Sequence, residues 1–409
     1  MEQNALTFIA KLKPEKADQI EETLRIIGRD INLKRDQHQA LLAQSAHLKL
    51  GEISTLHFGR FALIPNDATN KKDYLIFASN YDGELDNHLN EFLEKFPHGT
   101  VNIFNCCEGF PENLDPTTSQ GKRAFRRFIK KHDYRSAAFY QGYKGEAVAD
   151  VNTYIETRKN FQQYLDQHSV GDIPANLQAL SNDSVWVQGD QDSRKQTDIT
   201  MGKLAIVILD FMWHFILVFI WRRLTVRYPN GAPLNLELHD DGHKIRQNIA
   251  DIEDAVAQNQ VTIMSAIRPG LFNVFRVKFF LLFIQMAAKH IYNEGNLAGI
   301  STIHFARWVI IDQGRYLLFN SNYDGTWVNY IGDFVDKGAS GMDLIWYNAE
   351  RFPSQGAKDI QKFKDIIRRD QIETQVFYSA YPNATAKNIL SDRRLYHDIQ
   401  KHGGINQFK

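Results

Sequence analysis

Four polar residue types recur in two distant parts of the chain with nearly the same spacing. The first set is His57 and Arg60, followed by Asn80 and Asp82, and each pair adjoins an apolar, strand-like stretch. The second set has the same types in the same order: His304, Arg307, Asn322 and Asp324. Histidine and aspartate can transfer protons, and arginine can stabilise developing negative charge. The pattern therefore indicates a duplicated chemical site or a duplicated structural feature.

Both sets belong to an internal repeat. Residues 53–64 (ISTLHFGRFALI) match residues 300–311 (ISTIHFARWVII), and residues 74–83 (YLIFASNYDG) match residues 316–325 (YLLFNSNYDG). The offset between the copies is 247 residues in the first match and 242 in the second. This difference falls in the loop between the two segments, where a duplicated domain tolerates insertions best.

The elements around the repeat predict its topology. Each copy reads as a strand, a helix, two strands, a helix and a strand, which is the βαββαβ order of a ferredoxin-like unit. The closing strand of each copy holds a Phe-Tyr-x-x-Tyr sequence, and short apolar runs at 101–104 and 344–346 are predicted to be further strands. Such a sheet has one face open, so we expect an α+β protein in which the two copies bury their open faces against each other.

The length of 409 residues is typical of a chain with two or three domains. The repeats predict four segments: a first ferredoxin-like domain at 1–150, an insertion at 151–258, a second ferredoxin-like domain at 259–390 and a C-terminal tail at 391–409. The insertion includes an apolar helix at 204–221.

This arrangement resembles the dimeric α+β barrel superfamily, which includes dye-decolourising peroxidases and chlorite dismutases. The resemblance is one of topology over about 300 of the 409 residues, and it implies a pseudo-dimeric α+β barrel. Dye-decolourising peroxidases also carry a GxxDG motif, which both copies match as Ser-Asn-Tyr-Asp-Gly, with serine in place of the first glycine.

A bound haem is the cofactor that the resemblance implies. By the match to the motif, Asp82 and Asp324 would be distal acid–base residues, and Arg60 and Arg307 would stabilise charge during peroxide cleavage. A haem also needs a proximal histidine, and the spacing singles out none of four candidates: His304, His57, His290 and His214.

Each polar residue of the repeat also has a structural interpretation. Side chains alternate along a strand, so His57 and Arg60 point to opposite faces unless a bulge intervenes. An aspartate in an Asp-Gly pair before a helix commonly caps that helix, which is the structural role expected of Asp82 and Asp324. A lone histidine on an apolar strand is usually a core residue with its hydrogen bonds satisfied.

Two long apolar segments raise the question of a membrane. Residues 204–221 are nearly all apolar, but Asp210 and His214 lie one helical turn apart within them and would be costly in lipid. Residues 271–290 are apolar with interspersed cations, which is typical of a helix in the headgroup region. The two helices are expected either to contact a membrane peripherally or to pack on each other.

Composition narrows the partners and the compartment. The formal charge is zero, from 48 basic and 48 acidic residues, so we expect no nucleic-acid partner. The two cysteines, Cys106 and Cys107, are adjacent and offer neither a disulfide framework nor a zinc site. With no secretory signal at the N-terminus, the prediction is a cytoplasmic protein or one on the inner face of a membrane. The sequence His-Asp-Asp-Gly-His at 239–243 is interpreted as a turn and not as a metal site.

Two functions from different classes follow from these observations. The first is a haem-dependent, peroxidase-like oxidoreductase that acts on a hydrophobic or aromatic small molecule. If the apolar helices contact a membrane, this enzyme would act at the membrane surface. The alternative is a non-catalytic, membrane-peripheral protein that binds a lipid-like ligand. The sequence does not indicate an oligomeric state.

Overall fold

The computed structural model describes residues 1–36, 48–66, 71–168, 201–224, 257–292, 295–350, 352–353, 356 and 359–401. The predicted turn at 239–243 and the helix expected after it lie outside the described residues, apart from Ala257.

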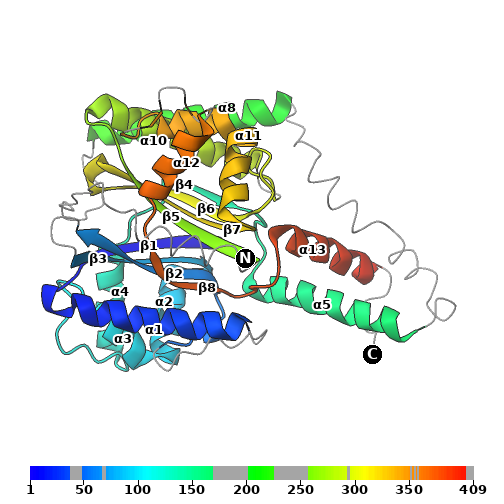
Figure 1. Ribbon diagram of the computed structural model, residues 1–409, viewed down its shortest axis with the longest axis horizontal. Coiled ribbons are helices and arrows are strands. Elements are labelled where there is room, and N and C mark those ends of the chain that lie inside the picture. Colours follow the sequence, from blue (N-terminus) through cyan, green and yellow to red (C-terminus); the bar gives the residue numbers. More distant parts are fainter. Residues whose placement is uncertain are drawn as a thin grey trace.

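Two four-stranded antiparallel sheets and the helices around them form a mixed α/β architecture (Figure 1). The first sheet has the strand order β1 (Gln3–Lys11), β3 (Lys71–Asp82), β2 (Leu56–Asn66) and β8 (Thr374–Ser379). The second has the order β4 (Ala138–Gln141), β6 (Ile303–Ile311), β7 (Tyr316–Asp324) and β5 (Gln258–Ala266). Side chains are buried on both faces of both sheets, so that buried residues, polar as well as apolar, run almost without interruption along β2, β6 and β7.

Each sheet takes one edge strand from the other half of the chain. Strand β8 pairs with β2, and β4 pairs with β6. Before each crossing, the chain runs briefly along its own half. Residues 132–134 exchange backbone hydrogen bonds with β1, and residues 370–372 do the same with β5. The exchange therefore occurs at equivalent places in both copies, and it ties the halves together through backbone hydrogen bonds.

Helices cover the outer face of each sheet (Figure 1). The first sheet is covered by α1 (Ala17–Asp36), α2 (Leu85–Lys95), α3 (Pro97–Phe104) and α4 (Ser119–Lys131). The second is covered by α10 (Leu271–His290), α11 (Trp327–Trp346) and α12 (Ile360–Arg369). Side-chain oxygens cap three of these helices, because Thr118, Thr326 and Asp359 accept backbone N–H groups of α4, α11 and α12.

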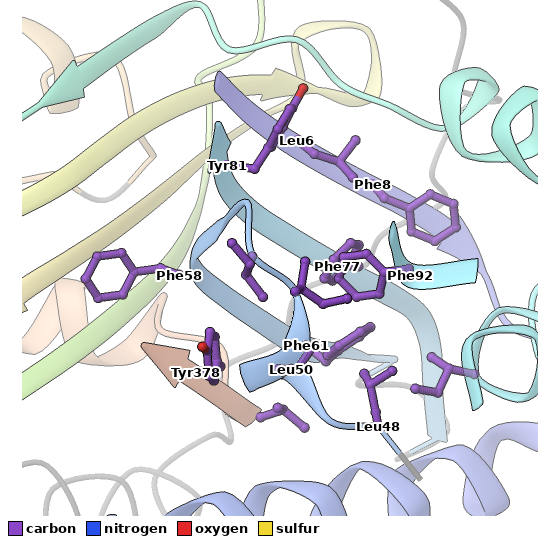
Figure 2. Close-up of a cluster of buried hydrophobic side chains, with 14 of the residues drawn as sticks. Leu6, Phe8, Leu48, Leu50, Phe58, Phe61, Phe77, Tyr81, Phe92 and Tyr378 are labelled. Atoms are coloured by element: carbon purple, nitrogen blue, oxygen red, sulfur yellow. The ribbon is translucent and has the colours of Figure 1, made fainter. Parts of the chain in front are cut away.

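Aromatic side chains fill the space between the first sheet and its helices. Figure 2 shows Phe61 and Phe77 close together in this core, with Phe92 beside them. The rings of Phe61 and Phe77 stack with their centroids 4.6 Å apart, and Phe92 meets Phe77 edge-on at 5.6 Å. A second apolar cluster lies between the two sheets and joins Ile9, Ala62 and Ile64 to Val309, Leu318 and other residues of both halves.

The two further strands predicted from short apolar runs are wrong. Residues 101–104 form the end of α3, which Pro97 starts at a position where its missing N–H has no cost. Residues 344–346 form the last turn of α11. In α3 the buried residues are Thr100, Ile103 and Phe104, which share one face of a helix, so the apolar run has a helical cause.

Two helices follow the exchanged strands and project from the sheets (Figure 1). They are α5 (Val148–Gln167) and α13 (Ala386–Lys401). A small apolar cluster of Phe161, Leu395 and Ile399 joins them. In addition, the buried Asp392 of α13 is paired with Arg158 of α5. Both helices begin next to the polar residues of the repeat, which places their N-termini at the candidate site.

Candidate functional site

A β-bulge at each histidine decides where the repeated polar residues point. The pairing of β2 with β3 shifts register between Leu56 and Phe58, and the pairing of β6 with β7 shifts between Ile303 and Phe305. Because of this bulge, His57 and Arg60 both extend toward the second half of the chain, as their contacts with Tyr381 and with β5 show. The two side chains nevertheless belong to separate hydrogen-bonded groups.

The first group is a continuous row of six buried side chains, here called the Asp–His–Tyr chain, which links Asp82, His57, Tyr381, Tyr143, His304 and Asp324. At its centre, the hydroxyl oxygens of Tyr143 and Tyr381 are 2.6 Å apart. Nδ1 of His57 lies 2.7 Å from the Tyr381 hydroxyl, and Nδ1 of His304 lies 3.0 Å from the Tyr143 hydroxyl. Each tyrosine thus bonds to the histidine of the other sequence repeat.

An aspartate closes each end of the Asp–His–Tyr chain. Nε2 of His57 is 2.9 Å from Asp82, and Nε2 of His304 is 2.8 Å from Asp324. The second oxygen of each carboxylate accepts a backbone N–H at 2.8 Å, from Val148 at the start of α5 or from its counterpart at the start of α13. A carboxylate at a helix N-terminus also interacts favourably with the helix dipole.

These contacts correct the expected role of the two aspartates. Neither aspartate caps the helix that follows it in sequence, since the residues at the N-caps of α2 and α11 are Glu84 and Thr326. Instead, Asp82 binds the first N–H of α5 and Asp324 binds that of α13. The aspartates therefore do support helix N-termini, but of helices that follow more than 60 residues later.

The two arginines form the second group and clamp the sheets together. Arg60 donates to the carbonyl oxygens of Val261 and Ser321, on β5 and β7, and also to the side chain of Asn322. In the equivalent arrangement, Arg307 donates to the carbonyl oxygens of Leu6 and Ser79, on β1 and β3. Among the described residues, neither guanidinium is hydrogen-bonded to Asp82 or Asp324.

Burial shifts the acidity of the groups between the sheets. The Arg60 guanidinium is 1% exposed, and burial, together with the charge of Arg307, lowers its pKa. Burial lowers the pKa of Arg307 to about 10. Burial also raises the pKa of the Tyr143 and Tyr381 hydroxyls well above their ordinary value, so both tyrosines stay protonated at neutral pH.

The histidines of the Asp–His–Tyr chain do not fit the expected role of haem ligands. An axial histidine must offer one imidazole nitrogen to the iron, whereas both nitrogens of His57 and of His304 are hydrogen-bonded and both rings are fully buried. Nε2 of His290 bonds to Asp210 at 2.6 Å, and the side chain of His214 lies outside the described residues. The haem interpretation stays a prediction, which a spectrum in the Soret region would test.

The two apolar segments form a second candidate site on the surface. Helix α8 (Met201–Leu224) packs along α10, where Asp210 bonds to Lys289 and His290 and where Phe211 meets Phe279. Large apolar side chains on both helices remain exposed: Met201, Ile206, Ile208, Leu209, Met212, Trp213, Leu271, Phe272, Phe275 and Phe283. We call these ten residues the apolar helix surface. The two helices therefore do pack on each other, and they still leave a wide apolar surface uncovered.

Comparison of the chain with family models, with curated proteins and with solved structures found no match.

Sequence reasoning missed the residues at the centre of the Asp–His–Tyr chain. Tyr143 and Tyr381 are the last residues of the repeated Phe-Tyr-x-x-Tyr sequences, for which the pattern alone predicts only strands. Their repetition beside a repeated histidine was the available signal. It could not be used without the strand exchange, because each tyrosine reaches the histidine of the other copy.

Proposed function

We propose that this protein is a non-catalytic, membrane-peripheral protein that binds the surface of an anionic bilayer through α8 and α10. The observation that carries the proposal is the concentration of exposed apolar side chains there. Among the described residues, fourteen large apolar side chains are exposed, of which six lie on α8 and four on α10. Exposed apolar side chains concentrated in this way on two neighbouring helices usually mark an interaction site.

Aromatic residues give this surface the character of a membrane interface. Trp213 is 61% exposed and Phe272 is 70% exposed, while Phe275 and Phe283 are each more than 40% exposed. Tryptophan and phenylalanine on the apolar face of an interfacial helix insert at the boundary between headgroups and acyl chains. The lipid-like ligand is thus the bilayer itself in this proposal.

Charge favours an anionic bilayer over a second copy of the chain. Helices α8 and α10 carry six basic residues, Lys203, Arg222, Arg223, Arg276, Lys278 and Lys289, against one acidic residue, Asp210. Asp210 is already bonded to Lys289 and His290. The rest of the chain is correspondingly acidic, because the whole chain is neutral. Two such surfaces facing each other would repel, whereas anionic headgroups would be attracted.

The packing of α10 favours a helix that lies in the plane of the membrane. Among the described residues, α10 is the one helix long and apolar enough to cross a bilayer, and most of it is exposed. One side of α10, however, packs on the second sheet through Val277 and Leu281, which are 1% and 0% exposed. A helix fixed to a sheet along one side cannot be surrounded by lipid.

Flotation with lipid vesicles tests the proposal. The protein should float with phosphatidylcholine vesicles that contain phosphatidylserine, float less without phosphatidylserine, and lose most of the charge-dependent part at high salt. Replacing Trp213, Phe272 and Phe275 together with serine should abolish flotation, because it removes the three most exposed aromatic side chains of the surface.

A matched control uses exposed apolar residues elsewhere. Val328 and Ile360 are 51% and 45% exposed on α11 and α12, so their replacement with serine should leave flotation unchanged. Absence of flotation at low salt would refute the proposal. If the protein instead forms a dimer that the triple serine variant dissociates, the occupant of the surface is a second copy.

We further propose that the two sequence repeats are ferredoxin-like units packed as a pseudo-dimeric α+β barrel, on the cytoplasmic face of the membrane. The equivalent strand orders support the fold, as do the equivalent crossings at residues 132–134 and 370–372. Two buried free thiols, Cys106 and Cys107, are compatible with a reducing compartment. An experimental structure of the whole chain would test the fold, and fractionation of cells would test the location.

A further inference from the structure

The number of hydrogen bonds in the Asp–His–Tyr chain fixes the number of protons that it holds. Its six side chains are joined by five contacts of 2.6–3.0 Å, and each contact needs one proton. Two ionised aspartates supply no proton, and each neutral histidine and each tyrosine supplies one, so the six side chains supply only four protons. If each histidine donates to its aspartate and each tyrosine to its histidine, no proton remains between the two hydroxyls.

We infer that the Asp–His–Tyr chain binds one proton more than neutral histidines and tyrosines provide, and that it relays this proton between His57 and His304. With the fifth proton in place, one histidine is doubly protonated and donates through Nδ1 to its tyrosine. That tyrosine donates to the other tyrosine, which donates to the neutral histidine at the opposite end. All five contacts are then hydrogen bonds.

The two ends of the Asp–His–Tyr chain are equivalent, so the extra proton has two matching positions. Starting from a doubly protonated His57, its Nδ1 proton moves to Tyr381, the Tyr381 proton moves to Tyr143, and the Tyr143 proton moves to His304. Each bond to hydrogen that breaks is matched by one that forms, and the positive charge passes from His57 to His304 without rotation of any ring. The aspartates stay ionised and stabilise the charge at either end.

The surroundings of the Asp–His–Tyr chain leave the extra proton without a competing partner. Phenylalanine rings of both halves flank it, with Phe305 5.4 Å from His57 and Phe58 5.1 Å from His304, measured between ring centroids. Of the ionisable neighbours, His88 on α2 is bonded to Thr55 and Ser79, and Tyr378 on β8 is buried.

Carboxylates and cations near the ends are engaged elsewhere. Glu146, before α5, accepts hydrogen bonds from Tyr154 and Arg393, and Asp150 on α5 accepts from the backbone of Ala147. The buried arginines of the second group donate to neutral acceptors of the opposite sheet. The described groups around the Asp–His–Tyr chain thus leave the two aspartates as the counter-charges of the fifth proton.

Nitrogen NMR of protein labelled with ¹⁵N in histidine tests the proton count in the native protein. At about pH 8, free histidine is neutral. The Asp–His–Tyr chain should nevertheless contain one imidazole with both nitrogens protonated, or two imidazoles that share this state equally. The signal is assigned by its loss in the variants His57→Gln and His304→Gln. Two neutral rings, each protonated only at Nε2, would overturn the inference.

A second measurement counts the proton by unfolding. At about pH 8 the unfolded protein holds four protons on these six residues, so they should contribute the release of one proton to the total measured on unfolding. The double variant Tyr143→Phe/Tyr381→Phe loses the three central bonds and should release one proton fewer than the parent.

Tyr140→Phe is the matched control for this measurement. Tyr140 is also fully buried, and its hydroxyl has no hydrogen-bond partner among the described residues. This variant should release the same number of protons as the parent. Equal proton release by the parent and the double variant would refute the extra proton.

Discussion

Replacing Asp82 with alanine should destabilise the folded protein far more than the loss of a surface carboxylate does. Asp82 is 3% exposed and joins three parts of the molecule, since it sits at the end of β3, accepts from His57 on β2 and accepts from the first N–H of α5. The substitution leaves the N–H groups of His57 and Val148 buried without an acceptor.

The magnitude follows from the two bonds that are lost. Loss of a side-chain acceptor at a helix N-terminus costs about 1 kcal/mol. A buried donor left without a partner, here Nε2–H of His57, costs about 1–3 kcal/mol. Together, the free energy of unfolding should fall by about 2–4 kcal/mol. The Asp82→Asn variant keeps one acceptor oxygen and should lie between the parent and Asp82→Ala.

Urea unfolding followed by tryptophan fluorescence and by circular dichroism measures this change. Asp324→Ala should cost a similar amount, because its contacts with His304 and Ala386 are equivalent. Glu94→Ala is the surface control, since Glu94 is 59% exposed and its pairing with Lys122 is worth at most about 1 kcal/mol. If Asp82→Ala costs no more than Glu94→Ala, the Asp–His–Tyr chain does not hold the two halves together.

Two further predictions concern a close approach and a buried histidine. Gly28→Ala should destabilise the folded protein by about 1–3 kcal/mol in thermal unfolding, because the added carbon would overlap the carbonyl oxygen of Gln375 on β8. Gly332→Ala is the control: the space around Gly332 is open, so this variant should be neutral or stabilising. Burial, with the nearby His57, lowers the pKa of His88 from 6.5 to about 3 in the folded protein. As the pH falls, the His88 imidazole is therefore protonated in the unfolded protein before it is protonated in the folded one. Stability should therefore fall by about 1.4 kcal/mol per pH unit below pH 6.5, and His88→Gln should remove this part of the slope; an unchanged slope would contradict the assignment.

Apolar patterns in the sequence predicted the main elements well. The strands with the repeated histidines and aspartates are present as β2, β3, β6 and β7, and the two long apolar segments are the helices α8 and α10. Short apolar runs were less informative, since residues 101–104 could equally be a buried strand or a helix turn. Only the helix start at Pro97 distinguishes the two.

The partners of the candidate residues could not be predicted from local patterns. The bulge at His57 depends on how β2 pairs with β3, and the acceptors of Arg60 lie on strands about 200 residues and more away in sequence. The exchange of β4 and β8 is equally invisible, because each strand has the same residue pattern whether it pairs within its own copy or with the other. Histidine and tyrosine therefore seemed unrelated in the sequence.

The exchanged edge strands also bear on how the chain can be divided and how it folds. A cut between α5 and α8 would leave an N-terminal fragment that lacks β8 and a C-terminal fragment that lacks β4. Each fragment would expose an unpaired strand edge, at β2 or at β6, that only the other fragment fits, so co-expressed fragments should associate while separate ones aggregate. In the intact chain, β2 and β8 are about 315 residues apart, and closing so long a loop makes their pairing a late step of folding.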